Sequence, residues 1–123
     1  MAVIGVSMSD ENISIVNLSY LEEYTDNDPE SLAELIGVFY ETFSGDLDML
    51  EKNITDGENK EWSQIAHKLK GSSGFIGAEK LKILCASAQN MQTASLDERR
   101  SIYQRIKEAY GAVCIFLQGE FKA

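Results

Sequence analysis

The residue best suited to covalent chemistry in this chain is His67, the only histidine among 123 residues. A neutral imidazole is a nucleophile at pH 7 and needs no activating base. Its surroundings, from Gln64 to Ala78, have the sequence QIAHKLKGSSGFIGA and consist mainly of small residues and lysines. We expect the rest of the chain to serve as the scaffold that positions this stretch.

Helical spacing places His67 on the outer surface of its segment. At roughly 100° per residue, one narrow stripe contains Trp62, Ile65, Ala66, Leu69, Ser73 and Ile76. His67 points about 150° away from the centre of that stripe. The outer surface also carries Lys60, Gln64, Gly71 and Gly74, with Lys70 at its margin. Because the stripe must face a core, His67 is expected to be exposed to solvent.

Two glycines follow His67 on this same surface, at positions 71 and 74. Glycine inside a helix costs about 1 kcal/mol relative to alanine, so their presence calls for a reason. We interpret these glycines as leaving space for a partner, because a missing side chain lets the backbone of another molecule approach the imidazole. Gly77 stands where the apolar pattern ends and is predicted to be an ordinary helix stop.

The string from His67 to Ala78, HKLKGSSGFIGA, resembles the signature of histidine-containing phosphotransfer (HPt) domains. In that signature, H-x-L-K-G-[SA]-[SA] is followed by an aliphatic residue, Gly and often Ala. The segment from Leu18 to Glu30 also resembles the entry to many bacterial members, so the resemblance covers roughly residues 15–119. It implies a four-helix bundle in which His67 accepts a phosphoryl group from an aspartate of one response-regulator receiver domain and passes it to another.

The resemblance also implies partners and a division of chemical roles. A hybrid sensor histidine kinase would stand upstream, and the receiver would bring the Mg²⁺ ion and the acidic pocket, so no cofactor or metal is expected on this chain. Because the sequence contains no kinase signature and no ATP-binding loop, the protein is expected to be a phosphocarrier and not a phosphoryl source.

Further residues are assigned to the site. Phosphoryl transfer depends mostly on positioning and charge neutralisation, and Lys70, one turn after His67, could supply part of that charge. Lys68 is expected to point to the other side and to be solvated.

Gln89 lies 12 residues after Gly77 and His67 lies 10 before it, so a helical hairpin could bring them to similar heights. The resemblance then implies that Gln89 bonds the imidazole, and an ordinary surface glutamine stays open as the alternative. Residues expected to dock the receiver are Gln64, Lys68, Gly71, Gly74, Lys82 and Ala86.

Three other functions were weighed against the phosphocarrier. A di-iron bundle enzyme needs Glu-x-x-His pairs, but position 64 is Gln and a single histidine cannot supply such a site. A serine hydrolase is excluded because residues 71–74 lack the G-x-S-x-G spacing and no histidine is left as a base. An HPt-like module that docks and sequesters a response regulator without transferring phosphate stays open, although the intact His67, Lys70 and Gly71 weigh against it.

The charge of the chain is unevenly distributed. The formal net charge is −9, which argues against binding of nucleic acid or anionic membrane. Residues 60–82 nevertheless contain five lysines and two glutamates, or +3, which leaves −12 for the remainder. A basic island therefore surrounds His67, made of Lys60, Lys68, Lys70, Lys80 and Lys82.

Cysteine content and hydropathy predict the compartment. Cys85 and Cys114 both fall in helical patterns and are expected to be reduced and mostly buried. The start of the chain lacks a basic region, and no apolar run approaches the length of a membrane span. We expect a monomeric cytoplasmic protein, or a nucleocytoplasmic one in a eukaryote.

The periodicity predicts an all-α fold for a single domain. Residues 1–14 are expected to form a flexible N-terminus and residues 15–123 an up-down antiparallel four-helix bundle with a short N-terminal lid helix. The lid is predicted from Ser19 to about Thr25, with a capping box of Ser19 and Glu22. The long helices are predicted from Pro29 to about Ile54 (with Asp28 as N-cap), from Lys60 to Ile76 (with Asn59 as N-cap), from Glu79 to Gln92, and onward from a second capping box of Ser95 and Glu98.

Overall fold

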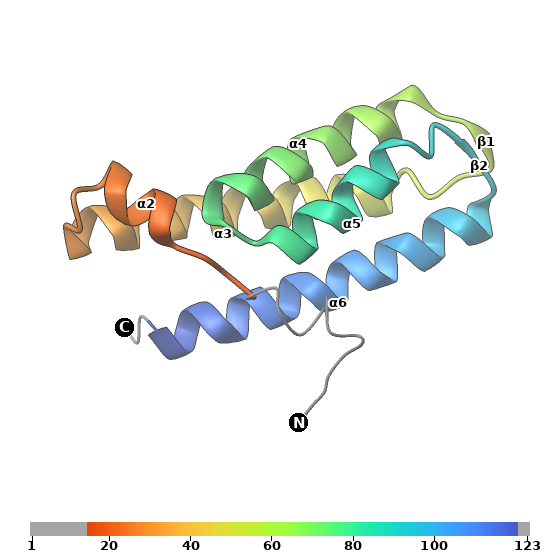
Figure 1. Cartoon of the computed structure of the whole chain (residues 1–123). Coiled ribbons are helices and arrows are strands. Elements are labelled where there is room, and N and C mark those ends of the chain that lie inside the picture. The colour runs from red at the N-terminus through yellow and green to blue at the C-terminus, as the bar shows by residue number, and fades with distance from the viewer. Residues whose placement is uncertain (1–14, 121–123) are drawn as a thin grey trace, which may run out of the picture.

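The computed structural model describes residues 15–120. Its elements are α2 (Ser19–Tyr24), α3 (Pro29–Glu51), β1 (Gly57–Glu58), α4 (Lys60–Ile76), α5 (Glu79–Gln89), β2 (Thr93–Ala94) and α6 (Leu96–Glu120). Figure 1 shows α3 to α6 running alternately up and down, with α2 at one end of the bundle and the two strands at the other. The predicted all-α antiparallel four-helix bundle with a short lid helix is therefore confirmed. The predicted flexible N-terminus lies outside the described residues.

The core is formed by one apolar face from each long helix. On α3 the buried residues are Leu32, Ile36, Phe39, Phe43, Leu47 and Leu50. On α4 they are Trp62, Ile65, Ala66, Leu69, Ser73 and Ile76, which is the predicted stripe. From α5 and α6 the core receives Leu81, Leu84, Cys85, Ala88, Ile102, Tyr103, Ile106, Val113 and Leu117. None of the helices within residues 15–120 is long and apolar enough to cross a membrane.

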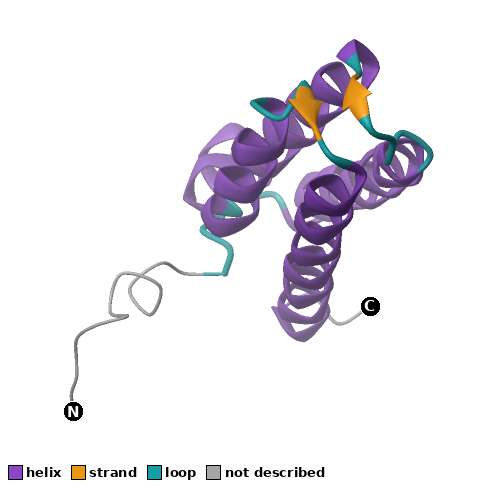
Figure 2. Ribbon diagram, turned by 90° about the vertical axis from the view of Figure 1, so that its right-hand side faces the viewer, coloured by secondary structure: helices purple, strands orange, loops and turns teal. Residues whose placement is uncertain are grey.

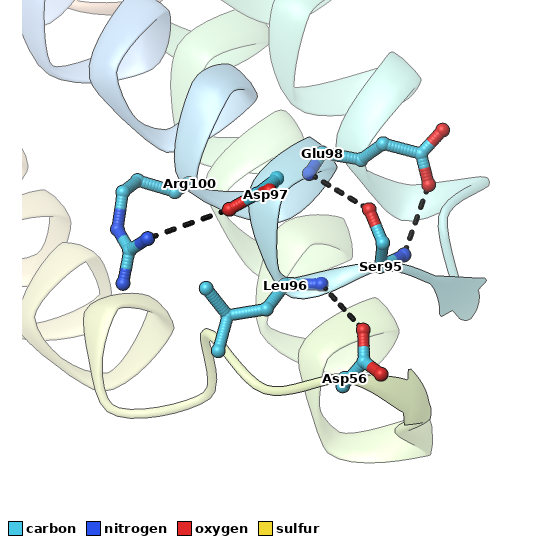
Figure 3. Close-up of polar contacts among 6 residues, drawn as sticks. All are labelled: Asp56, Ser95, Leu96, Asp97, Glu98 and Arg100. Carbon is cyan, nitrogen blue, oxygen red and sulfur yellow. Dashed lines mark hydrogen bonds and ion pairs between the residues drawn. The ribbon is translucent and has the colours of Figure 1, made fainter.

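The beginnings of the long helices follow local capping rules. The Asp28 carboxylate accepts a hydrogen bond from the Ser31 backbone N–H at 3.0 Å, and Asn59 Oδ1 accepts one from the Trp62 N–H at 3.1 Å. Figure 3 shows the capping box of α6, where Ser95 Oγ accepts from the Glu98 N–H and Glu98 Oε1 accepts from the Ser95 N–H. This backbone bond holds the pKa of the Glu98 carboxyl below its usual value. The caps predicted at Asp28, Asn59 and Ser95 are confirmed.

One predicted cap and two predicted helix ends were wrong. Ser19 does not cap α2, because it already lies in the first helical turn and its N–H donates to Asn17 Oδ1 at 3.0 Å. Helix α5 ends at Gln89 and not at Gln92. Beyond it, the carbonyl of Gln92 accepts hydrogen bonds from the Asn59 N–H and from Arg99, so residues from other elements bind this segment in a non-helical shape. Helix α3 likewise ends at Glu51, and Ile54 packs against the core from a loop.

A short antiparallel ribbon at this end of the bundle was not predicted. Gly57 pairs with Ala94 and Glu58 with Thr93, which ties the connection before α4 to the connection before α6 (Figure 2). Asp56 adds a contact by accepting a hydrogen bond from the Leu96 N–H at 2.8 Å (Figure 3). Strands of two residues carry no periodicity, so no sequence pattern predicts them.

The turn between α4 and α5 is fixed by Gly77. Its φ of 80° is in the left-handed region, and the Ala78 N–H bonds back to the Ser73 carbonyl, as in a Schellman motif. The Gly77 carbonyl also accepts a hydrogen bond from the Asn17 N–H at 2.8 Å, which joins the segment before α2 to the end of α4. A Cβ atom at position 77 would overlap the carbonyl of Asn17.

We predict that Gly77→Ala lowers the free energy of unfolding by more than about 1 kcal/mol, because the left-handed backbone and the Asn17 carbonyl both exclude a side chain. Gly37→Ala is the matched control, since Gly37 lies on the exposed side of α3 with open space around it. It should stabilise the protein by roughly 0.5–1 kcal/mol. Urea denaturation of both variants checks this, and equal effects would contradict it.

Candidate functional site

His67 lies on the outer surface of α4 and its side chain is exposed. The predicted orientation is therefore confirmed. Residues 62, 65, 66 and 69 hold the helix against the core, which fixes the direction in which residue 67 must point. A rigid element thus presents the only histidine of the chain to solvent.

An open groove of about 690 Å³ runs beside the imidazole. It is lined by Lys60, Ser63, Gln64, His67, Lys68, Gln89 and Gln92. The first five come from α4, and the other two come from the end of α5 and the segment that follows it. The structure therefore brings the predicted residues Gln64, Lys68 and Gln89 together with His67.

The wall of this groove is held by hydrogen bonds between α4 and the end of α5. Trp62 Nε1 donates to the Ala88 carbonyl at 2.8 Å, and Ser63 Oγ donates to the Gln89 carbonyl. The backbone N–H of Asn59 donates to the Gln92 carbonyl at 2.9 Å. These bonds use backbone carbonyls and leave the Gln89 side chain to line the groove, whereas the Gln92 amide also donates to Glu58 Oε2 at 3.4 Å.

Gln89 lies in the same groove as His67, as the hairpin argument anticipated. Within residues 15–120, however, no hydrogen bond joins the Gln89 amide to the imidazole. Its predicted role as an imidazole partner stays a prediction.

The two lysines nearest His67 differ in their surroundings. Lys68 lines the groove, whereas Lys70 is half-buried and is not among the lining residues. Lys68 is exposed, as expected, and forms with Gln64 one i, i+4 row that borders the groove. Support of a phosphoryl group by Lys70 stays a prediction.

The two glycines after His67 differ in their surroundings. Gly71 is exposed, and a Cβ atom built there would meet nothing within 4 Å. At Gly74 the same atom would lie 3.5 Å from Cδ of Lys82, so the aliphatic stem of that lysine from α5 covers it. Gly71 thus leaves open space for a partner beside the imidazole, while the space at Gly74 is occupied by the Lys82 side chain. Ala86, the remaining predicted docking residue, is half-buried on α5.

The lysines of the basic island are not neutralised by ion pairs. Within the described part of the chain, the one ion pair joins Arg100 to Asp97 at 3.7 Å, at the start of α6 (Figure 3). Lys60 and Lys68 border the groove, and Lys82 covers Gly74. The positive charge around His67 therefore faces solvent and is available to an anionic partner.

The two cysteines are free thiols, as predicted. Cys85 is buried, and burial raises the pKa of its thiol to about 11, so it stays protonated and unreactive at neutral pH. Cys114 is only half-buried, which departs from the expectation of a mostly buried residue. Across residues 15–120, no three His, Cys, Asp or Glu side chains are grouped so that they could hold a metal ion.

Sequence reasoning left three groove residues out of the site. Lys60 had been placed on the outer surface but given no role. Ser63 precedes His67 by four residues, and this spacing could have identified it. Gln92 had no local signal, because it was expected inside a longer α5.

Comparisons with known proteins give one family and one similar fold. The family model described as Hpt domain matches residues 34–114. The crystal structure of the histidine phosphotransferase ShpA from Caulobacter crescentus is similar to this chain with a TM-score of 0.60 and 21% sequence identity, over 87% of this chain and 94% of that one. At this identity the likeness to ShpA shows a shared fold. No curated protein sequence matches the chain.

We predict that His67→Gln changes the free energy of unfolding by less than about 0.5 kcal/mol, because the imidazole is exposed and has no bonding partner among the described residues. Trp62→Phe, on the same helix, is the contrasting variant. It removes the Trp62 Nε1 hydrogen bond to the Ala88 carbonyl, which keeps the Met91 N–H as a donor, and it leaves a smaller ring in the core, so it should cost about 1–3 kcal/mol. Thermal and urea unfolding distinguish the two, and a large loss in His67→Gln would give that residue a structural role.

Proposed function

The chain belongs to the Hpt domain family and has a phosphotransfer role in a phosphorelay; from this premise we propose that His67 is its phosphoacceptor. Hpt domains work with receiver domains and histidine kinases in such relays. His67 accepts the phosphoryl group from an aspartate of one receiver domain and delivers it to an aspartate of another.

The transfer is a displacement at phosphorus. The lone pair of the unprotonated ring nitrogen of His67 forms the N–P bond while the O–P bond of the aspartyl phosphate breaks, and the aspartate leaves as a carboxylate. The reverse displacement, by the carboxylate of a second receiver, returns the free imidazole. Little covalent chemistry is asked of the protein, and positioning and charge neutralisation supply most of the rate.

The observation that carries the proposal is the presentation of the single histidine. His67 is exposed on a rigid helix, beside an open groove and among lysines that have no ion-pair partner in residues 15–120. Open space at Gly71 lets a partner approach the ring. We place the Mg²⁺ ion and the acidic pocket on the receiver, so that the opposite charges of the two surfaces favour their encounter.

The alternative is a binding module that docks a receiver without accepting phosphate. It shares the docking surface and differs in one measurable property, which is covalent label on the protein. The decisive experiment is therefore a labelling experiment and not a binding experiment.

We predict that incubation with a receiver domain carrying ³²P on its aspartate transfers acid-labile, base-stable label to this chain. His67→Gln should abolish the label, because no other histidine is present, while its circular dichroism spectrum stays that of the wild type. Label that persists in this variant would refute His67 as the phosphoacceptor. Wild-type binding of the receiver without label would instead support the binding module.

Gly71 offers a second test, since we propose that its missing side chain is clearance for the receiver. Gly71→Gln should stabilise α4 by several tenths of a kcal/mol through helix propensity, yet slow transfer from the receiver. Gly37→Gln on α3 is the matched control, because it is also an exposed helical glycine with open space around it. It should raise the melting temperature similarly and leave transfer unchanged. If both variants transfer at the wild-type rate, Gly71 is not needed for clearance.

A further inference from the structure

Three aromatic side chains gather on the surface where α2 meets the end of α4. Tyr20 and Tyr24 stack with ring centroids 6.3 Å apart, and Phe75 meets them edge-on at 5.9 and 6.2 Å. Despite these contacts, 57% of Tyr20, 66% of Tyr24 and 36% of Phe75 remain exposed. Large aromatic residues that cluster on a surface indicate an interaction site more often than isolated ones do. We call these three residues the aromatic patch.

The aromatic patch is continuous with the surface around His67. His67, Gly71 and Phe75 are spaced four residues apart and therefore form one row along α4. Phe75 lies about 12 Å along the helix axis from His67. A protein interface of about 800 Å² per partner has a radius of about 16 Å if it is round. A receiver centred over the imidazole would therefore reach Phe75, the ring of the aromatic patch that lies on α4.

The electrostatic character of the patch is opposite to that of the groove. Glu23 is exposed and follows Tyr20 by three residues on α2, so the two are neighbours on the helix surface. Residues 1–51 contain no lysine or arginine, whereas the groove is bordered by Lys60 and Lys68. Aromatic faces beside a carboxylate favour a cation, and arginine stacks on such faces while it pairs with the carboxylate.

We propose that the aromatic patch and Glu23 form a second docking subsite, which binds an exposed arginine or lysine of the receiver. This inference rests on the proposed function, because the receiver is the partner that His67 engages. The lysines around the groove meet the acidic pocket of the receiver, and the aromatic patch meets a basic side chain elsewhere on the same receiver surface. Two subsites of opposite charge allow a single orientation of the partner and thereby align its aspartate with the imidazole.

The test uses an unphosphorylated receiver domain that binds the wild-type protein. Calorimetry measures the affinity of this receiver for three variants. Glu23→Lys should weaken binding about tenfold, because it places a like charge against the receiver cation. Tyr24→Leu should weaken binding several-fold, because it keeps an apolar side chain but removes the ring face. Glu41→Lys on α3 is the control, since Glu41 is exposed and the substitution changes net charge equally. It should stay within about twofold of the wild type.

The outcomes separate this inference from the proposed function. Labelling of His67 by potassium phosphoramidate needs no docked protein, so its rate should be the same in Glu23→Lys and wild type. Wild-type affinity in Glu23→Lys, or a loss no larger than that in Glu41→Lys, overturns the subsite. Tighter binding by Glu23→Lys also overturns it, because the patch would then face an acidic surface. If Tyr24→Leu lowers the melting temperature, Glu23→Lys decides, since the exposed Glu23 side chain makes no hydrogen bond or ion pair within residues 15–120.

Discussion

The buried guanidinium of Arg99 is the interaction on which much of this structure depends. Arg99 is fully buried on α6, and a buried cation is costly unless hydrogen bonds compensate, which here they do at both terminal nitrogens but not at Nε. Its Nη1 donates to the Thr55 carbonyl at 2.7 Å, and its Nη2 donates to the carbonyls of Met91 and Gln92 at 3.0 and 2.7 Å. Its Cζ lies 5.5 Å from the centroid of the Trp62 ring. One side chain therefore joins the connections before α4 and after α5 to the start of α6.

This arrangement reaches the functional surface through the end of α5. Trp62, which the guanidinium covers, donates to the Ala88 carbonyl, and Ser63 binds the next carbonyl along, that of Gln89. Trp62, on the core-facing side of α4, thus binds α5, and so does its neighbour Ser63, which lines the groove beside His67. Because the groove is built from helices held in this way, its shape exists before any partner arrives. Such preorganisation suits a transfer that depends mainly on positioning.

Charge is separated along the chain in a way that fits a relay intermediate. The first 51 residues carry only acidic side chains among their charged residues, while the segment 60–82 is basic. In the fold, this segment supplies α4 and the start of α5, so the positive charge surrounds the imidazole. A relay domain must bind and release successive partners. Complementary surface charges speed the association of such partners, whereas a large apolar interface would slow their dissociation.

The sequence by itself determined those features of the fold and the site that depend on residues within about four positions of one another. The bundle, the exposed His67, the stop at Gly77 and the caps at Asp28, Asn59 and Ser95 all follow from such spacing. The tertiary structure decided features that depend on distant residues: the ribbon of β1 and β2, the early end of α5, the burial of Arg99, and the entry of Gln92 into the groove. The bonds responsible span 26 residues from Trp62 to Ala88 and 44 from Arg99 to Thr55. Helical periodicity carries no information over such separations, so only the folded chain could fix them.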